Sequence, residues 1–314
     1  MICFKRDLSI NLVLMGISAI VIYLYIFVGN PDHNIVLHVR LPRFLLTVQT
    51  GSILAGVGSV YQLMFANPLA DPYVLGISSG AAFGAMLFAV IGLVAIMPLG
   101  GFLGAITTII LVWFLARING VMDKNRLLVS GVIASMFFSA GISLIMYLFQ
   151  KDTMLIFGVL MGNLGKIFTI LEWRLYLGMF FVSVCLMIHL YSKSLVLDII
   201  SGGDSYARSV GINIPRERLR VFVLSSILIG ICVAYAGIIG FVGLVTPHII
   251  RFFIPYEQKR IFYYSMLVGA LFLLVCDLIA KNVAAIELPV GVITAFIGCP
   301  FFMYILISKS ISRH

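Results

Sequence analysis

The sequence predicts an all-α integral membrane protein with about ten transmembrane helices, and three observations support this fold class. Of its 314 residues, 62% are hydrophobic and 11% are charged, whereas soluble domains carry about 25% charged residues. Apolar runs long enough to cross a bilayer core of about 30 Å recur along the whole chain. No polar interval between these runs is long enough to bury a core of its own. Residues 1–314 are therefore expected to form a single polytopic domain.

The first two predicted spans are 8–28 and 44–65. The first is longer than the ~7–15-residue apolar core of a signal peptide, so we interpret it as a spanning helix. The second follows the charged sequence RLPR at 40–43 and ends at two proline breaks, at 67–68 and 71–72. Backbone groups that proline frees in a membrane must be satisfied inside the protein or beside water, and such breaks line transport pathways.

Eight further apolar runs complete the predicted set of spans. We expect spans at 74–92, 99–115, 127–149, 175–190, 221–235, 237–254, 262–279 and 290–307. The eighth span of the full set, 237–254, is short and contains Pro247. A long polar segment separates the sixth span from the seventh.

The distribution of lysine and arginine predicts the orientation of the chain. With ten spans both termini lie on one side of the membrane, and that side holds fifteen of the 21 basic residues. The other side holds the remaining six, which are Arg40, Arg43, Lys151, Lys166, Arg174 and Lys281. The positive-inside rule then places both termini in the cytoplasm. The net charge of +9 is thereby assigned to cytoplasmic loops, and no nucleic-acid partner is expected.

Two stretches of the chain resemble each other. GSILAGVGSVYQLMFANPLA at 51–70 is similar to GICVAYAGIIGFVGLVTPHI at 230–249. The first belongs to a span that begins outside and the second to one that begins inside. This pattern indicates an inverted repeat, with spans two to five related to spans seven to ten, as in many transporters.

Four motifs resemble, in the same order, those of the FecCD-type permeases, the binding-protein-dependent ABC importer permeases for iron–siderophores, haem and vitamin B12. They are RLPR at 40–43, NPLADPYVLGISSGA at 67–81, GFVGLVTPHIIRF at 240–252 and ELPVGVITAFIGCPFF at 287–302. The resemblance implies a permease in the bacterial cytoplasmic (inner) membrane. It also implies a second permease in a homodimer or a paired heterodimer, a dimer of cytoplasmic ABC ATPases and an extracytoplasmic substrate-binding protein. ATP and Mg²⁺ then belong to the ATPase, and no cofactor is expected in this chain.

Three cations on the predicted outer side are candidates for docking the binding protein. The resemblance implies that Arg40, Arg43 and Lys281 contact its acidic residues, and an arginine fork suits a carboxylate. Anchoring at lipid headgroups is the alternative interpretation for cations at span ends. Lys281 can also pair with Asp277, four residues earlier on the same helix. We expect water to reach both Asp277 and Glu287, because they lie near span ends.

Asn67 and Leu69, in the motif NPLA, are the candidate gate residues. From the residues alone this is a helix end followed by an Asn-Pro turn. The resemblance implies that the two positions line a cytoplasmic gate of the translocation pathway.

The segment 197–220, LDIISGGDSYARSVGINIPRERLR, is the candidate for coupling to the ATPase. Asp204 is positioned to cap a short helix, Gly211 to end it and Pro215 to open the next one. The resemblance implies that this segment fits a groove in the ATPase and transmits its movement. Gly203, Asp204, Ala207 and Gly211 match the family's motif, whereas Ser205 stands in place of its usual glutamate. Arg208, in the same short helix, is a further candidate for this contact. An ordinary solvated loop is the alternative.

Other functions receive less support from the sequence. GNLGKIF at 162–168 resembles a phosphate loop, but lacks the glycine four residues before Gly165 and the Ser or Thr after Lys166, so ATP hydrolysis is not expected here. The chain shows no HExxH sequence and no paired acids of a membrane enzyme. An ion-gradient-driven secondary transporter is the alternative function, and it requires a buried carboxylate near the bilayer midplane.

No metal site is expected. The five cysteines are scattered without a CxxC pair, which gives neither a disulfide framework nor a thiolate site. His33 and His38 lie five residues apart in the predicted outer loop, a spacing that gives little support for haem or metal contact. His248, in the eighth span, is interpreted as a packing residue.

Overall fold

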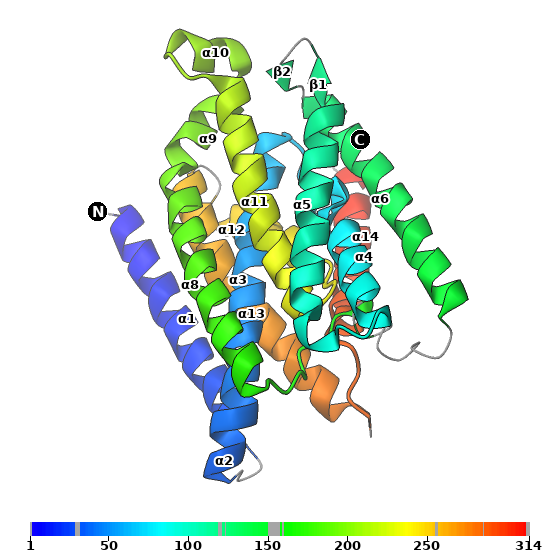
Figure 1. The fold of residues 1–314 in the computed structure, drawn as a ribbon. Helices are drawn as coiled ribbons and strands as arrows, with labels where there is room; N and C mark the ends of the chain where they lie inside the picture. The colour runs from blue at the N-terminus through cyan, green and yellow to red at the C-terminus, as the bar shows by residue number, and fades with distance from the viewer. Residues whose placement is uncertain are drawn as a thin grey trace.

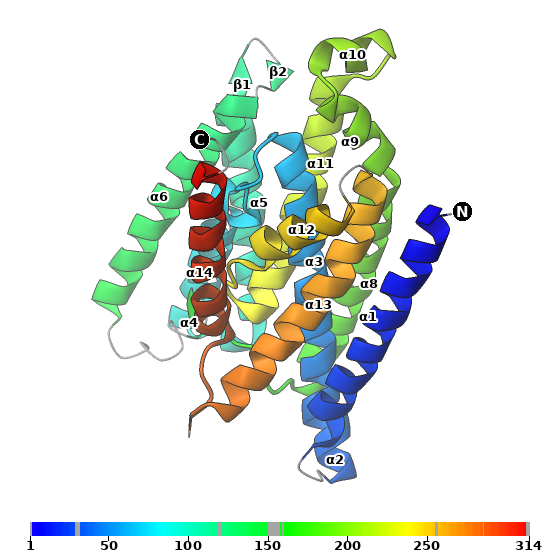
Figure 2. The ribbon, with the colours of Figure 1, turned by 180° about the vertical axis from the view of Figure 1, so that it is seen from behind.

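The computed structural model is a bundle of long helices that run along one common direction (Figure 1, Figure 2). It describes residues 2–28, 32–118, 121–122, 124–149, 158, 160–254, 257–284 and 286–311. Within these residues the all-α prediction is confirmed, apart from a hairpin of two two-residue strands.

The first half of the chain supplies five long helices and several short elements. In order they are α1 (Ile2–Phe27), α2 (His33–Ile35), the π-helical turn η1 (Val36–Arg40), α3 (Leu41–Met64), the 3-10 turn η2 (Pro72–Leu75), α4 (Ile77–Val90), the 3-10 turn η3 (Val94–Ile96), α5 (Met97–Leu115), β1 (Arg117–Ile118), β2 (Val121–Met122) and α6 (Lys124–Leu148).

The described residues of the second half form helices joined by loops. It contains α8 (Ile170–Ser192), the short α9 (Ser194–Ser201) and α10 (Asp204–Ser209), then α11 (Ile214–Ala236), α12 (Val242–Phe253), α13 (Gln258–Asn282) and α14 (Val290–Ile311). The predicted segment 197–220 therefore holds the end of α9, all of α10 and the start of α11.

Within the residues that the structure describes, six helical stretches are long and apolar enough to cross a bilayer, namely 33–64, 97–115, 126–148, 170–192, 214–236 and 258–282. Four shorter apolar helices in the same residues cover 11–27, 77–90, 242–253 and 290–305. Each predicted span overlaps one of these helices, so the membrane character of the chain is supported. The number of crossings stays a prediction, as does the inverted repeat.

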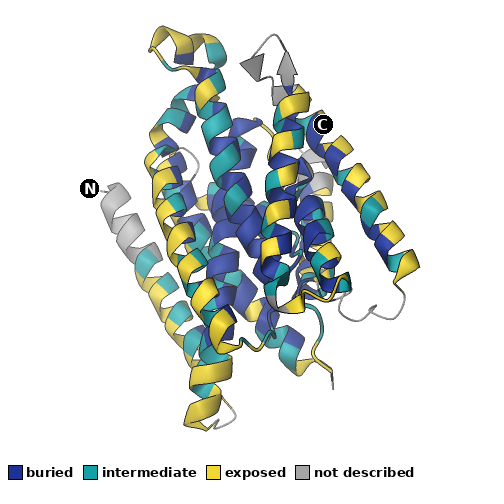
Figure 3. Cartoon of the chain, in the orientation of Figure 1, coloured by how far each residue is buried: buried dark blue, intermediate teal, exposed yellow. Residues whose placement is uncertain are grey.

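α3 and α11 occupy the centre of the bundle, whereas α8 lies at its periphery. In the most apolar window of each helix, 78% of residues are buried in α3 and 72% in α11, against 22% in α8. Figure 3 shows the buried residues gathered on the central helices and the exposed ones on the outer helices. Many exposed side chains are themselves apolar, among them Phe137 on α6, Phe181 on α8 and Phe296 on α14. Such a surface is suited to lipid or to another protein.

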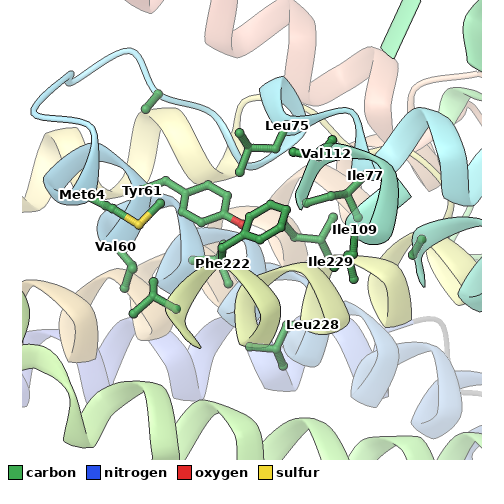
Figure 4. Packing of buried hydrophobic residues seen from close by; sticks show 14 of the residues in the cluster. Val60, Tyr61, Met64, Leu75, Ile77, Ile109, Val112, Phe222, Leu228 and Ile229 are labelled. Carbon is green, nitrogen blue, oxygen red and sulfur yellow. The ribbon is translucent and has the colours of Figure 1, made fainter. Parts of the chain in front are cut away.

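The main core lies where α3, α5, α11 and η2 meet. The fully buried rings of Tyr61 on α3 and Phe222 on α11 lie beside each other, with Leu75 of η2 and Val112 of α5 around them (Figure 4). Between helices in a bilayer the hydrophobic effect contributes little, because lipid is as apolar as the core, so close van der Waals packing stabilises such contacts.

Small residues bring α3 close to its neighbours. A Cβ atom placed on Gly51 would lie 2.4 Å from the carbonyl oxygen of Gly269 on α13, and one on Gly58 would lie 2.0 Å from the carbonyl oxygen of Gly243 on α12. Neither position has room for a side chain. This agrees with the general use of small residues at helix interfaces in membranes.

The two ends of the bundle carry different elements. α10 and the hairpin β1–β2 project at one end, which we call the α10 end, and α2 projects at the other, the α2 end (Figure 1). α1 begins toward the α10 end and α14 ends toward it (Figure 2). Both chain ends thus share a side of the bundle with the segment 197–220. Their placement in the cytoplasm stays a prediction.

Candidate functional site

Arg43 lies at the α2 end, in the first turn of α3, and its side chain is buried in a network of charges. Its Nε donates to Oδ2 of Asp277 at 3.0 Å and its Nη2 donates to Oδ1 at 2.8 Å, which makes a two-pronged contact with α13. Its Nη1 donates to Oε2 of Glu287, in the loop before α14, at 2.8 Å. One arginine therefore joins α3 to α13 and to the chain that enters α14.

Two further side chains complete this group. The hydroxyl of Tyr25, on α1, donates to Oδ2 of Asp277. The ammonium of Lys281 lies 3.4 Å from the same carboxylate and 3.8 Å from the centre of the Tyr25 ring. We call Tyr25, Arg43, Asp277, Lys281 and Glu287 the outer ion cluster. The predicted pairing of Lys281 with Asp277 is confirmed.

The expectation that water reaches both acids is wrong for Asp277. Its side chain is 1% exposed, whereas that of Glu287 is 56% exposed. Helix α1 and Arg43 cover Asp277, and the sequence separation of 234 residues between Arg43 and Asp277 hid this contact from the sequence.

Arg40 uses its side chain differently. Its Nη1 donates to the carbonyl oxygens of Ile26 and Val28, at 2.8 and 2.7 Å, and so satisfies the last turn of α1. Arg40, Arg43 and Lys281 nevertheless line one pocket of about 500 Å³ at the α2 end, between α1 and α13. The structure thus brings the three candidate docking cations together, and docking itself stays a prediction.

Asn67 and Leu69 lie in the turn that follows α3, at the α10 end of that helix. Oδ1 of Asn67 accepts from the backbone N–H of Leu69 at 2.9 Å, and both residues are exposed. The expected Asn-Pro turn is present, and the gate role stays a prediction. Asp71 follows in the same loop and accepts from the N–H of Tyr73 at 2.8 Å, which caps η2. Burial raises the pKa of the Asp71 carboxyl to about 6.

The candidate coupling segment is ordered as a short helix held against α11. Gly203 precedes α10 with a φ of +123° and Gly211 follows it with a φ of +86°, both in the region that favours glycine. The methyl group of Ala207 is fully buried beneath the helix, while Arg208 is exposed. The structure has a helix here, so the alternative of an ordinary solvated loop is wrong.

The predicted capping role of Asp204 is wrong. Gly203 occupies the N-cap position, and no side chain caps α10 there. The Asp204 carboxylate instead accepts from Nη1 and Nη2 of Arg218, on α11, at 3.2 and 2.8 Å. Asp204 is the first residue inside the helix, so its carboxylate is directed to the neighbouring guanidinium and away from the free N–H groups. This pair fixes α10 on the first turns of α11.

Arg218 and Asp198 are two functional candidates that the sequence did not reveal. Both carboxylate oxygens of Asp198, on α9, lie 3.2 Å from the backbone N–H of Gln258, the first residue of α13. Burial raises the pKa of the Asp198 carboxyl above its usual range. Neither residue belongs to a recognisable spacing pattern, because their partners lie 14 and 60 residues away.

The stretch at 162–168, which resembles a phosphate loop, has a structural role at the α2 end. Its start is held by neighbouring helices, since the Asn163 N–H donates to the Ala236 carbonyl and the Val290 N–H donates to the Gly162 carbonyl. Lys166 pairs with Glu172 at 3.0 Å, in the capped first turn of α8. Lys166 is thus paired with a carboxylate of the α8 capping box.

Among the described residues, no group of three or more His, Cys, Asp or Glu side chains could hold a metal ion. His33 and His38 are both exposed on α2 and η1. His248 is buried among the rings of Phe252, Phe301 and Phe302, as its interpretation as a packing residue predicts.

Comparison with known proteins identifies the family. The model of the FecCD transport family matches residues 1–308. The chain belongs to the FecCD transport family. The resemblance drawn from the four sequence motifs is therefore confirmed.

Three curated relatives illustrate the range of this family. The chain is 34% identical to the hemin transport system permease protein of Yersinia pestis, over 89% of this chain and 85% of that one. It is 34% identical to an Fe(3+)-citrate import system permease protein of Bacillus subtilis, over 88% and 83%. It is 32% identical to the vitamin B12 import system permease protein of Vibrio vulnificus, over 96% and 95%.

A solved structure shares the fold. A metal-chelate type ABC transporter in an inward-facing conformation superposes with a TM-score of 0.84 at 28% sequence identity, covering 95% of this chain and 99% of that one. The two chains therefore share their fold over nearly all of the aligned length.

Proposed function

We propose that this chain is the translocation subunit of an ATP-driven importer for an iron–siderophore, haem or cobalamin-type substrate. The observation that carries the proposal is the family match over residues 1–308, together with relatives of nearly equal length that import hemin, Fe(3+)-citrate and vitamin B12. The three named cargoes share large, chelated metal centres. The chain itself performs no covalent chemistry, and ATP hydrolysis with its Mg²⁺ is assigned to a separate ABC ATPase.

The chain is proposed to cross the bacterial cytoplasmic membrane ten times, with both termini and the α10 end in the cytoplasm. The predominance of lysine and arginine on that side supports this orientation. Exchanged packing between the two halves supports the inverted repeat, because α3 packs on α13 and α12 whereas α11 packs on α5 and α4. Gly51 meets α13 at Gly269, and its counterpart Gly230 meets α5 at Ala105.

A second permease copy is proposed to pack against the side formed by α6 and α14. Both views place these two helices on one side of the bundle (Figure 1, Figure 2). An apolar pocket of about 640 Å³ opens there, lined by Phe241 and by Phe296 and Met303 of α14. The side chains of Met136 and Phe137 on α6 are more than 60% exposed. A substrate path along the axis of such a pair needs little selectivity of its own, because the binding protein selects the cargo.

Movement of the ATPase is proposed to reach the permease through α10 and the contact of Asp204 with Arg218. A helix that is fixed by a two-pronged ion pair moves as one body with α11, which a mobile loop cannot do. Asn67 and Leu69 are proposed as the cytoplasmic gate, and their exposure at the end of the central helix α3 supports this. The cations Arg40, Arg43 and Lys281 are proposed to receive acidic residues of the binding protein at the opposite end.

The ion-gradient alternative receives no support from the buried acid that it requires. Asp277 is bonded to the guanidinium of Arg43, to the Tyr25 hydroxyl and to Lys281. Asp277 also lies near the end of α13 at the α2 end of the bundle, away from its middle, and its oxygens are bonded to these fixed partners.

The experiment is ATP hydrolysis by the permease purified with the ABC ATPase encoded beside it, in lipid vesicles, with and without the binding protein. Wild-type activity is expected to respond to the binding protein. Asp204→Lys is expected to uncouple hydrolysis, and the double variant Arg40→Glu, Arg43→Glu is expected to abolish the response to the binding protein. A permease that neither binds nor alters the ATPase contradicts the proposal.

A further inference from the structure

Helix α13 is capped by a side chain that comes from the coupling segment. The first N–H groups of a helix have no partner within it and form the positive end of its dipole. At α13 the N-cap residue is Glu257, which makes no side-chain cap bond. Asp198 of α9 supplies the acceptor instead, with both carboxylate oxygens 3.2 Å from the N–H of Gln258. The start of α13 is therefore held by α9, the helix that leads directly into α10.

The contact continues from α13 into two more helices. The side chain of Gln258 is buried, and its Nε2 donates to the hydroxyl of Ser59 on α3 at 3.2 Å. The Ser59 carbonyl accepts from Nη2 of Arg251, on α12, also at 3.2 Å. We call Asp198, Gln258, Ser59 and Arg251 the polar seam. It joins α9, α13, α3 and α12 at the α10 end of the bundle.

Two buried hydrogen-bond acceptors lie in or beside the polar seam without a partner among the described residues. Oε1 of Gln258 and Oε1 of Gln62, one turn along α3 from Ser59, are buried and have no hydrogen-bond partner among the described residues. A buried acceptor without a partner is costly, and most buried polar atoms in native proteins are paired. A group of donors and acceptors that is only partly matched in one arrangement of the helices has further pairings to adopt in another.

α13 connects this seam with the outer ion cluster. The helix is continuous from Gln258 to Asn282 over 25 residues, which is about 37 Å at 1.5 Å per residue. Asp198 lies at its first residue, and near its last turns lie Asp277 and Lys281 of the outer ion cluster. A shift of the capped end therefore displaces the carboxylate that holds Arg43. Helix α3, which carries Arg43, also packs against α9, but the hydrogen bonds of Asp198 reach α13.

We propose that Asp198 is a positioning residue for transport, through which movement of α9 and α10 is passed to α13 and along it to the outer ion cluster. The inference rests on the proposed importer function and adds to it the route by which the two ends of the permease are linked. In this proposal α13 moves as one rigid helix that links the two ends of the bundle. The polar seam is the contact through which α9 moves it.

The experiment follows the far end of α13 while nucleotide acts at the near end. An environment-sensitive fluorophore is attached to Asn282→Cys, in a background without the exposed Cys185 and Cys299. The permease is assembled with its ABC ATPase in lipid vesicles, and the emission change on addition of a non-hydrolysable ATP analogue is recorded. Retention of the ATPase is measured on the same samples by size-exclusion chromatography.

Three substitutions are compared in this background. Asp198→Ala removes the cap, and the fluorescence response is expected to fall about five-fold, the equivalent of the ~1 kcal/mol that a helix cap contributes. Asp198→Asn keeps an acceptor of similar quality and is expected to retain at least half of the response. Glu257→Ala is the matched control, since Glu257 lies at the same helix end but pairs with Arg260 on the surface, at 2.6 Å. The control is expected to respond like the wild type.

The possible outcomes separate failure of this inference from failure of the importer function. An unchanged response of Asp198→Ala, with the ATPase retained, overturns the inference and leaves the importer function standing. Loss of ATPase binding in that variant also overturns it, because Asp198 would then belong to the docking surface. If Asp198→Ala does not fold, Ser59→Ala tests the next contact of the seam, and an unchanged response there counts against the inference. A wild type that does not respond to nucleotide removes the importer function itself.

Discussion

Removal of Arg43 is the perturbation with the clearest expected cost. The guanidinium makes hydrogen bonds of 3.0, 2.8 and 2.8 Å, two of them to Asp277, whose side chain is 1% exposed. Breaking a buried ion pair by removing one partner costs about 3–5 kcal/mol, because the remaining charge stays buried. Lys281 remains 3.4 Å from the carboxylate and compensates in part. We therefore expect Arg43→Ala to lower the free energy of unfolding by about 3 kcal/mol, the lower end of that range.

Two matched variants separate the buried contact from the exposed one. Glu287 is 56% exposed, so Glu287→Ala is expected to cost less than about 1 kcal/mol, as exposed ion pairs do. The double variant Arg43→Met, Asp277→Leu removes both buried charges and is expected to be more stable than Arg43→Ala.

The assay is reversible unfolding in mixed micelles with increasing dodecyl sulfate, followed by circular dichroism. Free energies of unfolding are compared for Arg43→Ala, for Glu287→Ala and for the four members of one cycle, namely the wild type, Arg43→Met, Asp277→Leu and the double variant. An Arg43→Ala variant within about 1 kcal/mol of the wild type would refute the reasoning. Simple additivity of the two single variants would refute it as well, because groups in contact are expected to show an interaction energy.

Three further predictions concern the rest of the bundle. Gly58→Val is expected to destabilise the fold by more than about 2 kcal/mol, because its Cβ would lie 2.0 Å from a backbone oxygen of α12. Gly178 has open space around it, so the control Gly178→Val is expected to be neutral in the same unfolding assay. Burial raises the pKa of Asp71 from 3.8 to about 6, so folding favours the protonated carboxyl. Its contribution to the free energy of unfolding is therefore complete below pH 4 and is lost as the pH rises through 6. Wild type is thus expected to lose about 1 kcal/mol relative to Asp71→Asn between pH 5 and 7.5, and a constant difference across that range contradicts this. The single variants Asp204→Arg and Arg218→Asp are expected to lower the free energy of unfolding by about 1.5–3 kcal/mol, because Asp204 is 45% exposed but Arg218 is only 9% exposed. Both are expected to lose coupled ATP hydrolysis, which the double exchange is expected to restore in part.

Local signals in the sequence predicted the positions of the helices well. Apolar runs locate the body of each helix, since hydropathy reports directly on lipid exposure and burial, while some helix starts differ by up to seven residues, as for α11 at 214 against the expected 221. The starts of α8 and α11 were missed by several residues for one reason. Each begins with a polar turn beyond the apolar run, capped by Thr169 and by Asn213. Hydropathy detects the apolar part of a helix and not its capped, charged extension.

The contacts between distant segments were beyond the reach of the sequence. The pairs Arg43 with Asp277 and Asp198 with Gln258 join residues 234 and 60 positions apart. Each member alone resembles a surface charge or a loop residue, and only the packing of α3 and α9 against α13 brings the partners together. The sequence also does not show whether the Asp204 carboxylate caps a helix or forms an ion pair. In the structure it pairs with the guanidinium of Arg218, which lies close to it.

The most direct test of the central claim is uptake by vesicles that contain the permease and its ABC ATPase, with binding protein outside and ATP inside. Hemin, ferric citrate and cyanocobalamin are supplied separately, each with and without ionophores that dissipate proton and sodium gradients. We predict that at least one cargo accumulates, that accumulation requires ATP, and that ionophores leave it unchanged. Accumulation that proceeds without ATP and stops on addition of ionophores would contradict the account and favour an ion-driven transporter.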